Sequence, residues 1–309
     1  MQRRKSKKPI FNAFGISDIG VNPKRTKNED SFKINTSIGL FIVADGVGGY
    51  AGGKIASDLV VRKMDVFLSN VLKALDEDRD ESVQDLEHFP ELSEEDLFKR
   101  SIASANRAVY DENIRLKSEL ESEVLKSNKF KRKGNMGTTL VAGLARNNKI
   151  YVVNIGDSRL YRLRDGMLQQ LTVDQSILEE KLQSGEITED EAKTEKRNRI
   201  TQCVGTRKTV NIEVDRLTTR VGDRYIMCTD GLTDGFLDEE LFRTATETMK
   251  QENLKQICSE LIELAKRGGS RDNITVVIFD IVDLGIKPPG QQWKEDGLDD
   301  EETLMPGWD

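Results

Sequence analysis

Short apolar segments joined by tight turns occur in groups along this chain, and longer amphipathic segments separate the groups. The apolar segments are about four to eight residues long, a length typical of buried strands. Strands are expected from Phe11 onward and at residues 31–35, 40–44, 139–144, 150–155, 159–163, 211–217, 224–228 and 275–282. Asp165-Gly166 indicates a hairpin turn. Because hairpins join neighbouring strands, the order favours α+β layers over a parallel sheet.

Three amphipathic segments are predicted to be helices. Residues 54–72 carry apolar side chains at the i, i+3, i+4 spacing of a single helix face. A second helix is expected to begin at Ser93, because Ser93 and Asp96 have the spacing of a capping box. A third is expected over about residues 253–267, with Asn253 as its N-terminal cap.

The remaining segments divide the chain into one domain and its flanks. We expect a basic leader at residues 1–9, a domain over 10–282 and an acidic tail at 283–309 that is disordered. Residues 73–96 are interpreted as an acidic insertion, and residues 115–135 are charged without a clear pattern. The leader lacks the apolar segment of a signal peptide, and no stretch approaches the ~18 apolar residues of a membrane span, so a cytoplasmic protein is predicted.

Aspartates stand where several of the expected strands end, beside a glycine or another small residue. They are Asp45, Asp157, Asp230 and, just before the last strand, Asp272. A strand fixes the direction of its terminal side chain, and an adjacent glycine lets the backbone and a ligand approach closely. Any one of them alone is explained as a turn residue. Four hard carboxylate ligands together favour a site for Mg²⁺ or Mn²⁺.

Other catalytic chemistries are disfavoured by the rest of the sequence. The single histidine, His88, lies in a polar acidic stretch, so a Ser-His-Asp or Cys-His mechanism lacks its base. Cys203, Cys228 and Cys258 lie far apart, form no CxxC pair and begin no C-x5-R phosphate loop. The net charge of −7 gives no general attraction to nucleic acid or membranes. Acid-base work therefore falls to carboxylates, water or metals.

Short motifs follow one another along the chain in a specific order. They are residues 17–20 (SDIG), 25–30 (RTKNED), 45–49 (DGVGG), 137–139 (GTT), 154–159 (NIGDSR), 171–176 (LTVDQS), 197–201 (RNRIT), 229–231 (TDG) and 271–275 (RDNIT). Over about residues 11–282 this series resembles the PP2C (PPM) family of metal-dependent protein serine/threonine phosphatases, in its compact bacterial form. The resemblance implies a four-layer αββα sandwich, with two central antiparallel β-sheets flanked by α-helices and a flap at about residues 175–200.

The resemblance also implies two core Mn²⁺ or Mg²⁺ ions in a cleft between the sheets, and a weaker third ion. Asp45 would bridge the two core ions, which share the hydroxide that attacks phosphorus. Asp230 and Asp272 would complete one core ion, and the carbonyl of Gly46 would bind the other. Asp157 would share the third ion with Asp230.

Further roles follow from the same resemblance. Arg25 would bind the substrate phosphate as a fork-shaped donor and so act in catalysis. Glu29 would act on a metal through water, and Asp30 would support the metal shell. Asp18 and Asn273 are expected to support the site without binding metal.

The chain departs from the family pattern at three places. Val47 stands where larger relatives have a histidine proposed as the general acid, so the proton for the leaving group is expected from metal-bound water. Two extra residues lie around Asn22-Pro23 in the opening motif. Tyr50 and Gln175 replace two family histidines that are not metal ligands.

The predicted activity is hydrolysis of phosphoserine and phosphothreonine in proteins, which would reverse the action of a Ser/Thr kinase. The partners would be phosphorylated proteins, either such a kinase or its targets, and the chain is expected to be a monomer that binds neither nucleic acid nor membranes. One alternative is a catalytically weak PP2C-like signalling or binding module. Another is a different metal-dependent hydrolase, a nuclease or a nucleotide phosphatase, although the missing basic stripe disfavours a nuclease.

Overall fold

The structure is a computed structural model that describes residues 8–48, 52–77, 92–127, 135–192, 195, 199–236 and 239–285. Most of the predicted leader and acidic tail lies outside the described residues, as does the centre of the 73–96 insertion with His88. Tyr50 and both tryptophans, Trp293 and Trp308, also lie outside them. The predicted domain limits therefore stay predictions. The first described strand begins at Ile10 and the last ends at Asp283.

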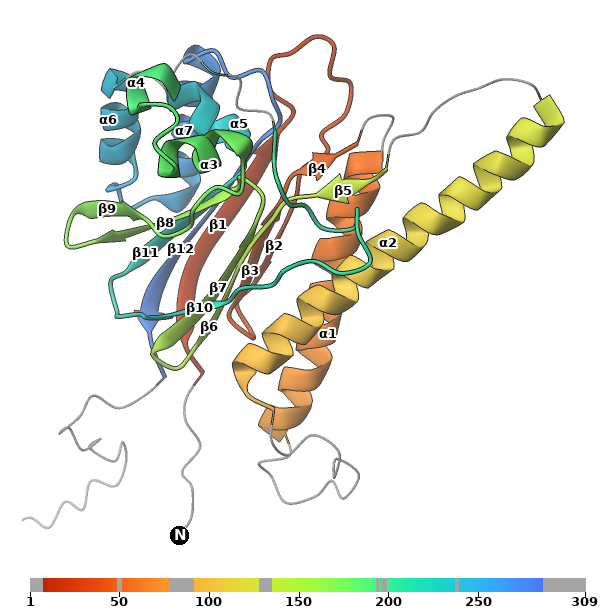
Figure 1. Ribbon diagram of the computed structural model, residues 1–309. Coiled ribbons are helices and arrows are strands. Elements are labelled where there is room, and N and C mark those ends of the chain that lie inside the picture. The colour runs from red at the N-terminus through yellow and green to blue at the C-terminus, as the bar shows by residue number, and fades with distance from the viewer. Residues whose placement is uncertain are drawn as a thin grey trace, which may run out of the picture.

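Two antiparallel five-stranded sheets form the centre of the fold (Figure 1). The first has the order β1 (Ile10–Asp18), β12 (Ile274–Asp283), β11 (Arg224–Cys228), β8 (Arg159–Arg164) and β9 (Met167–Gln170). The second has the order β10 (Asp215–Thr218), β7 (Lys149–Ile155), β6 (Leu140–Arg146), β3 (Leu40–Ala44) and β2 (Ser31–Asn35). A short ribbon pairs β4 (Gly46–Val47) with β5 (Gly137–Thr138). The strands β2 and β3 lie at the predicted residues.

The two sheets pack face to face through buried aromatic and aliphatic side chains. The rings of Phe41 (β3) and Phe279 (β12) are stacked with centroids 3.7 Å apart, and Tyr225 (β11) stacks on Phe279 at 5.0 Å. Phe11 meets Phe41 edge-on at 5.3 Å. Such aromatic pairs add to the stabilisation that comes from the burial of their large apolar surface. The sheets therefore form a rigid support for the loops at their ends.

Helices cover the outer face of each sheet, which gives four layers (Figure 1). The long helices α1 (Gly52–Glu77) and α2 (Glu94–Ser127) share one core with the second sheet. The first sheet shares another core with α5 (Asp230–Thr233), η1 (Asp234–Phe236), α6 (Glu239–Thr248) and α7 (Leu254–Arg267). Two short helices, α3 (Ile177–Gln183) and α4 (Glu189–Ala192), lie in the predicted flap region. The predicted αββα sandwich of the α+β class is confirmed.

The predicted helix caps and hairpin turn are also confirmed. The backbone amide of Asp96 donates to the Ser93 hydroxyl (3.1 Å), and its carboxylate accepts from the Ser93 amide (3.2 Å). The side chain of Asn253 accepts from the backbone amide of Gln256, the third residue of α7. Asp165 and Gly166 both have positive φ, at 51° and 77°, as a two-residue type I′ hairpin requires.

Three segments differ from the predictions. Helix α2 continues to Ser127, through part of the charged region that the pattern left unassigned, because its surface carries ion pairs one turn apart such as Arg115–Glu119 (2.6 Å). Helix α6 was not predicted, because few of its residues are apolar. Residues 211–214 are not a strand, because the main chain of Asn211 bonds the side chain of Gln202 instead of another strand.

Candidate active site

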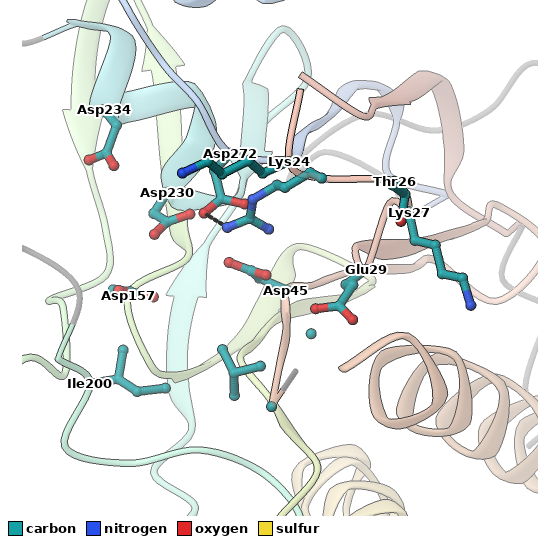
Figure 2. Close-up of a pocket in the computed structure, with 14 residues that line it drawn as sticks. Lys24, Thr26, Lys27, Glu29, Asp45, Asp157, Ile200, Asp230, Asp234 and Asp272 are labelled. Carbon is teal, nitrogen blue, oxygen red and sulfur yellow. Dashed lines mark hydrogen bonds and ion pairs between the residues drawn. The ribbon is translucent and has the colours of Figure 1, made fainter. Parts of the chain in front are cut away.

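A pocket of about 870 Å³ opens at one end of the sandwich, where loops from both sheets meet (Figure 2). Most of the predicted site residues line it, namely Arg25, Glu29, Asp45, Gly46, Asp157, Asp230 and Asp272. Its wall also includes Lys24, Thr26, Lys27, Val47, Gly48, Ile200 and Asp234. Asp18, Asp30 and Asn273 lie behind this wall. The pocket therefore collects carboxylates from segments that are far apart in the sequence.

Asp45 is held by backbone and hydroxyl contacts at the junction of β3 and β4. Its amide donates to the hydroxyl of Thr139 (2.9 Å), while its carbonyl accepts from the Thr138 hydroxyl (2.8 Å) and the Thr139 amide (2.8 Å). Its side chain faces the pocket (Figure 2) although the residue is 8% exposed. These contacts fix the direction of the carboxylate.

Gly46 is required where helix α1 begins next to β4. A Cβ atom at Gly46 would lie 2.4 Å from the backbone of Gly53 and 2.6 Å from the carbonyl oxygen of Glu29. No side chain fits in that space, since real Cβ contacts are longer. The glycine thus lets the start of α1 approach the residue that follows Asp45.

Asp30 lies behind the pocket wall, between the ends of β11 and β12. Its Oδ2 atom accepts from the hydroxyls of Thr229 (3.0 Å) and Thr275 (2.6 Å). Its Oδ1 atom is buried and has no hydrogen-bond donor in the described part of the chain. Burial raises the pKa of Asp30 to about 6, although the two threonine hydroxyls act in the opposite direction.

Asp230 and Asp45 are both buried carboxylates with other carboxylates close by. The Oδ1 atom of Asp230 is buried without a hydrogen-bond partner among the residues that the structure describes. Burial, and after it the neighbouring carboxylates, raises the pKa of both side chains well above 3.8. A divalent cation supplies the opposite charge that such oxygens lack. The orphaned oxygens and the hard donor set therefore fit Mn²⁺ or Mg²⁺.

Asp272 faces Arg25 across the pocket mouth. The guanidinium of Arg25 forms an ion pair with the Asp272 carboxylate, drawn as a dashed line in Figure 2. Within the described residues, no group of three or more His, Cys, Asp or Glu side chains is arranged as a ready-made metal site. The carboxylates share one pocket but are not gathered around a single point.

The two predicted supporting residues anchor the loop that carries Arg25. Asn273 is 1% exposed; its side chain accepts from the Glu29 amide (2.9 Å) and donates to the carbonyl of Ile19 (3.0 Å). Asp18 accepts from Lys266 on α7 (2.9 Å) and lies outside the pocket wall. Both residues therefore position the β1–β2 loop.

Asp157 lies on the far side of the pocket, after β7. Burial raises its pKa to about 6, and the neighbouring Asp174 adds to this shift. Asp234 lines the same pocket and was missed by the sequence reasoning. Its signal was the spacing from Asp230, because residues four apart lie on one face of a helical turn. Asp157, Asp230 and Asp234 also line a smaller cavity of about 90 Å³ beneath α3.

Comparisons with known proteins agree with this geometry. The family model described as "Protein phosphatase 2C" matches residues 23–264. Serine/threonine protein phosphatase PstP of Mycobacterium tuberculosis is 35% identical over 290 residues, which cover 93% of this chain and 49% of that protein. The chain thus spans about half the length of that relative. A putative protein phosphatase 2C-type of Streptococcus pyogenes is 32% identical over 268 residues, 85% of this chain and 94% of that protein.

A solved structure shows the same fold. The catalytic domain of PstP in complex with two manganese ions is 32% identical, with a TM-score of 0.64, over 88% of this chain and 99% of that chain. No helix in the described ranges has the length and apolar character needed to cross a bilayer. The sequence motifs, the two-sheet sandwich and the carboxylate pocket agree with these matches, and the chain belongs to the protein phosphatase 2C family.

Proposed function

We propose that this chain hydrolyses phosphoserine and phosphothreonine in proteins with the help of two Mn²⁺ or Mg²⁺ ions. One observation carries the proposal: Asp230 in the pocket wall with Arg25, and Asp30 behind that wall, each keep a buried carboxylate oxygen without a donor among the described residues. Its support from outside the chain is that the relatives are named serine/threonine protein phosphatases. The PstP catalytic domain, which has the same fold, was solved with two manganese ions.

The residues that would hold the ions are the oxygen donors of the pocket wall. They are Asp45, the Gly46 carbonyl, Asp230 and Asp272, with Glu29 nearby and Asp157 for a weaker third ion. Bound divalent ions would lower the pKa of water and neutralise charge on the phosphoryl group. The buried contacts of Asp30 with Thr229 and Thr275 keep this part of the pocket rigid.

Arg25 is the candidate for binding the substrate phosphate. Its side chain is 34% exposed and lines the pocket mouth. A guanidinium has five N–H donors, so the pair with Asp272 leaves donors for two phosphate oxygens. The loop contacts of Asn273 hold this guanidinium at the mouth rather than in free solvent.

The proton for the leaving group has no histidine source in the described pocket wall. Val47 lines the wall at the position where larger relatives have a histidine. We therefore assign this proton to water in the pocket. The rate should then depend on the acidity of the leaving alcohol more strongly than in a relative with an imidazole acid.

The proposal is tested by measuring the hydrolysis of a phosphothreonine peptide with added Mn²⁺. The negative controls are the same assay with EDTA and the Asp45→Asn variant. We expect hydrolysis that needs the metal and is lost in the variant. A wild-type chain that binds Mn²⁺ and the peptide without hydrolysing it would instead be the binding module of the alternative reading. The opposing kinase, the monomeric state and the cytoplasmic location stay predictions.

A further inference from the structure

The loop between β1 and β2 places three cationic side chains on the wall of the carboxylate pocket. Arg25 is paired with Asp272, but Lys24 and Lys27 are exposed and form no ion pair with any residue that the structure describes. Figure 2 shows Lys24 toward the Asp272 side of the pocket and Lys27 toward the Glu29 side. The two ammonium groups are therefore available to an anion that comes from outside the chain.

Lys24 projects from a well-defined turn. The carbonyl of Asn22 accepts from the amide of Arg25 (3.0 Å), and the Asn22 side chain accepts from the amide of Lys24 (3.1 Å). Pro23 occupies the second position of this turn, where its fixed φ is favoured. These are the residues around which the opening motif is longer than the family pattern. The extra length builds the turn that presents Lys24 beside Arg25.

Lys27 projects from a backbone position that is also anchored. Its carbonyl accepts from the side chain of Asn273 (3.4 Å), and that same side chain accepts from the Glu29 amide (2.9 Å). The next residue, Asn28, donates to Ser17 (2.7 Å). Both lysines thus leave a fixed main chain, which lowers the entropy lost when they bind a partner.

The charges of the pocket decide what these lysines can recognise. The other ionisable residues of the described wall are carboxylates, apart from the paired Arg25. An acidic substrate side chain would be repelled by that cluster, so it needs a cation outside the cluster. Lys24 and Lys27 line the pocket wall beside Arg25, the residue proposed to bind the substrate phosphate.

We propose that Lys24 and Lys27 make this phosphatase select phosphopeptides with acidic residues flanking the phosphorylated serine or threonine. The inference rests on the proposed function and names its substrate class. Lys24 and Lys27 are three positions apart, so their Cα atoms lie at most about 10 Å from each other. An extended peptide rises about 3.3 Å per residue. The acidic side chains should therefore lie within about three residues of the phosphorylated one.

Three phosphothreonine peptides that differ only in their flanks test the proposal. One has alanine at the flanking positions, one has aspartate, and one has a second phosphothreonine, which offers a larger negative charge from a phosphate instead of a carboxylate. The wild-type kcat/KM should be higher for both anionic peptides. In the Lys24→Ala/Lys27→Ala variant, the ratio of acidic to neutral peptide should fall about 1.5- to 5-fold for each lysine, the range of an exposed ion pair.

Charge reversal and a matched control sharpen the test. Lys24→Glu/Lys27→Glu should invert the ratio and favour a peptide with lysine flanks. Lys255→Ala, at another exposed lysine that has no ion pair in the described ranges, should leave the ratio unchanged. The wild-type ratio should also decline as salt is added. A ratio near one for the wild-type chain, or an equal ratio in the double alanine variant, would overturn the inference.

A second readout separates this inference from the proposed function. Affinity for the same labelled peptides, measured by fluorescence anisotropy, gives the ratio without turnover. If the affinity ratio depends on the lysines but no peptide is hydrolysed, the proposed function is wrong and the selection by Lys24 and Lys27 is supported. If the peptides are hydrolysed but neither ratio depends on the lysines, the selection is wrong and the proposed function is supported.

Discussion

Asp30 and Asp230 each bury a carboxylate oxygen with no donor in the described part of the chain. A buried charge without compensation costs stability in the folded state. The chain therefore keeps a destabilising arrangement at the place where the proposed cations would bind. Active sites commonly show this exchange of stability for function.

Asp230→Asn is the direct test of that cost. Without metal, the variant should be more stable than the wild type: its free energy of unfolding should be about 1–3 kcal/mol higher, because a neutral amide replaces the buried charge. Its added stabilisation by Mn²⁺ should fall sharply. Urea denaturation in EDTA and in Mn²⁺ measures both. Asp111→Asn, at an exposed ion pair with Arg107, is the control and should change stability by less than about 1 kcal/mol.

Gln175 supports the turn that carries Asp157. Its side-chain amide donates to the carbonyl of Asn154 (3.0 Å), and its side-chain oxygen accepts from the amide of Gly156 (3.1 Å). This glutamine stands where the family has a histidine. It satisfies main-chain groups one and three residues before Asp157, so we interpret it as a residue that positions that carboxylate.

Gln175→Ala should therefore reduce the unfolding free energy by about 1–3 kcal/mol, because both main-chain groups lose their partner. It should also raise the Mn²⁺ concentration needed for half-maximal turnover, while the peptide KM changes little. Gln183→Ala removes only a contact with Glu179 on the surface and serves as the control. Equal metal requirements in the two variants would leave Gln175 a purely structural role.

At the scale of elements, α2 holds the segment that runs past the pocket through two asparagines on its inner face. Asn113 accepts from the Met136 amide (2.8 Å) and donates to the carbonyls of Met136 (2.8 Å) and Gly205 (2.9 Å). Asn106 accepts from the Gly205 amide (2.8 Å). Met136 precedes β5, and β5 pairs with β4 beside Asp45. Helix α2 thus supports the site from a distance.

Two substitutions in α2 separate this role from that of its charged surface. Asn113→Ala should lower the unfolding free energy by about 2–4 kcal/mol, because three main-chain groups lose their partner. Arg115→Ala, two residues further along α2, should cost less than about 1 kcal/mol, since its ion pairs are exposed. Urea denaturation with circular dichroism measures both. Similar losses in the two variants would contradict the assignment.

At the scale of the whole molecule, hydrogen bonds from the Arg164–Asp223 ion pair to Thr218 and Thr219 join the two sheets at the end away from the pocket. The buried carboxylate of Asp223 accepts from two nitrogens of Arg164 on β8 (both 2.6 Å) and from the hydroxyl of Thr219, which follows β10 (3.0 Å). Burial acts to raise the pKa of Asp223, but the hydrogen bonds from Arg164 and its neighbours outweigh it and lower the pKa.

A lowered folded-state pKa predicts how stability changes with pH. The contribution of Asp223 is present above the unfolded pKa, about 3.9, and is lost as pH falls through the lower folded value. Asp223→Ala should cost about 3 kcal/mol at pH 7, because Arg164 loses its partner. It should also flatten the loss of stability below about pH 4. Chemical denaturation across pH 3–7 checks this, and an unchanged slope would contradict it.

The sequence predicted those elements whose own pattern decides their structure. Strands β2 and β3 and helix α7 carry a full apolar period, and their predicted limits agree with the structure within about one residue. Helix α6 has only ten residues and few of them are apolar, and the outer turns of α2 depend on ion pairs, so neither segment was predicted to be helical.

The site was predictable residue by residue only where a strand end and a motif coincided. The wall positions of Asp45 and Asp230 follow from such strand ends. The pairing of Arg25 with Asp272 joins residues 247 positions apart, which local patterns do not report. Lys24 and Lys27 are ordinary exposed residues in the sequence, and only the shared pocket shows that they stand beside the carboxylates.

Strand β12 ends the described chain, yet it lies inside its sheet between β1 and β11. Asp272 and Asn273 directly precede it, and Asn273 holds the loop that carries Arg25. During synthesis the first strand must wait for the last one before that sheet and the pocket mouth can close. A chain that stops short of this strand would lack the interior of that sheet together with Asp272 and Asn273, so the pocket mouth could form only after β12 has been added.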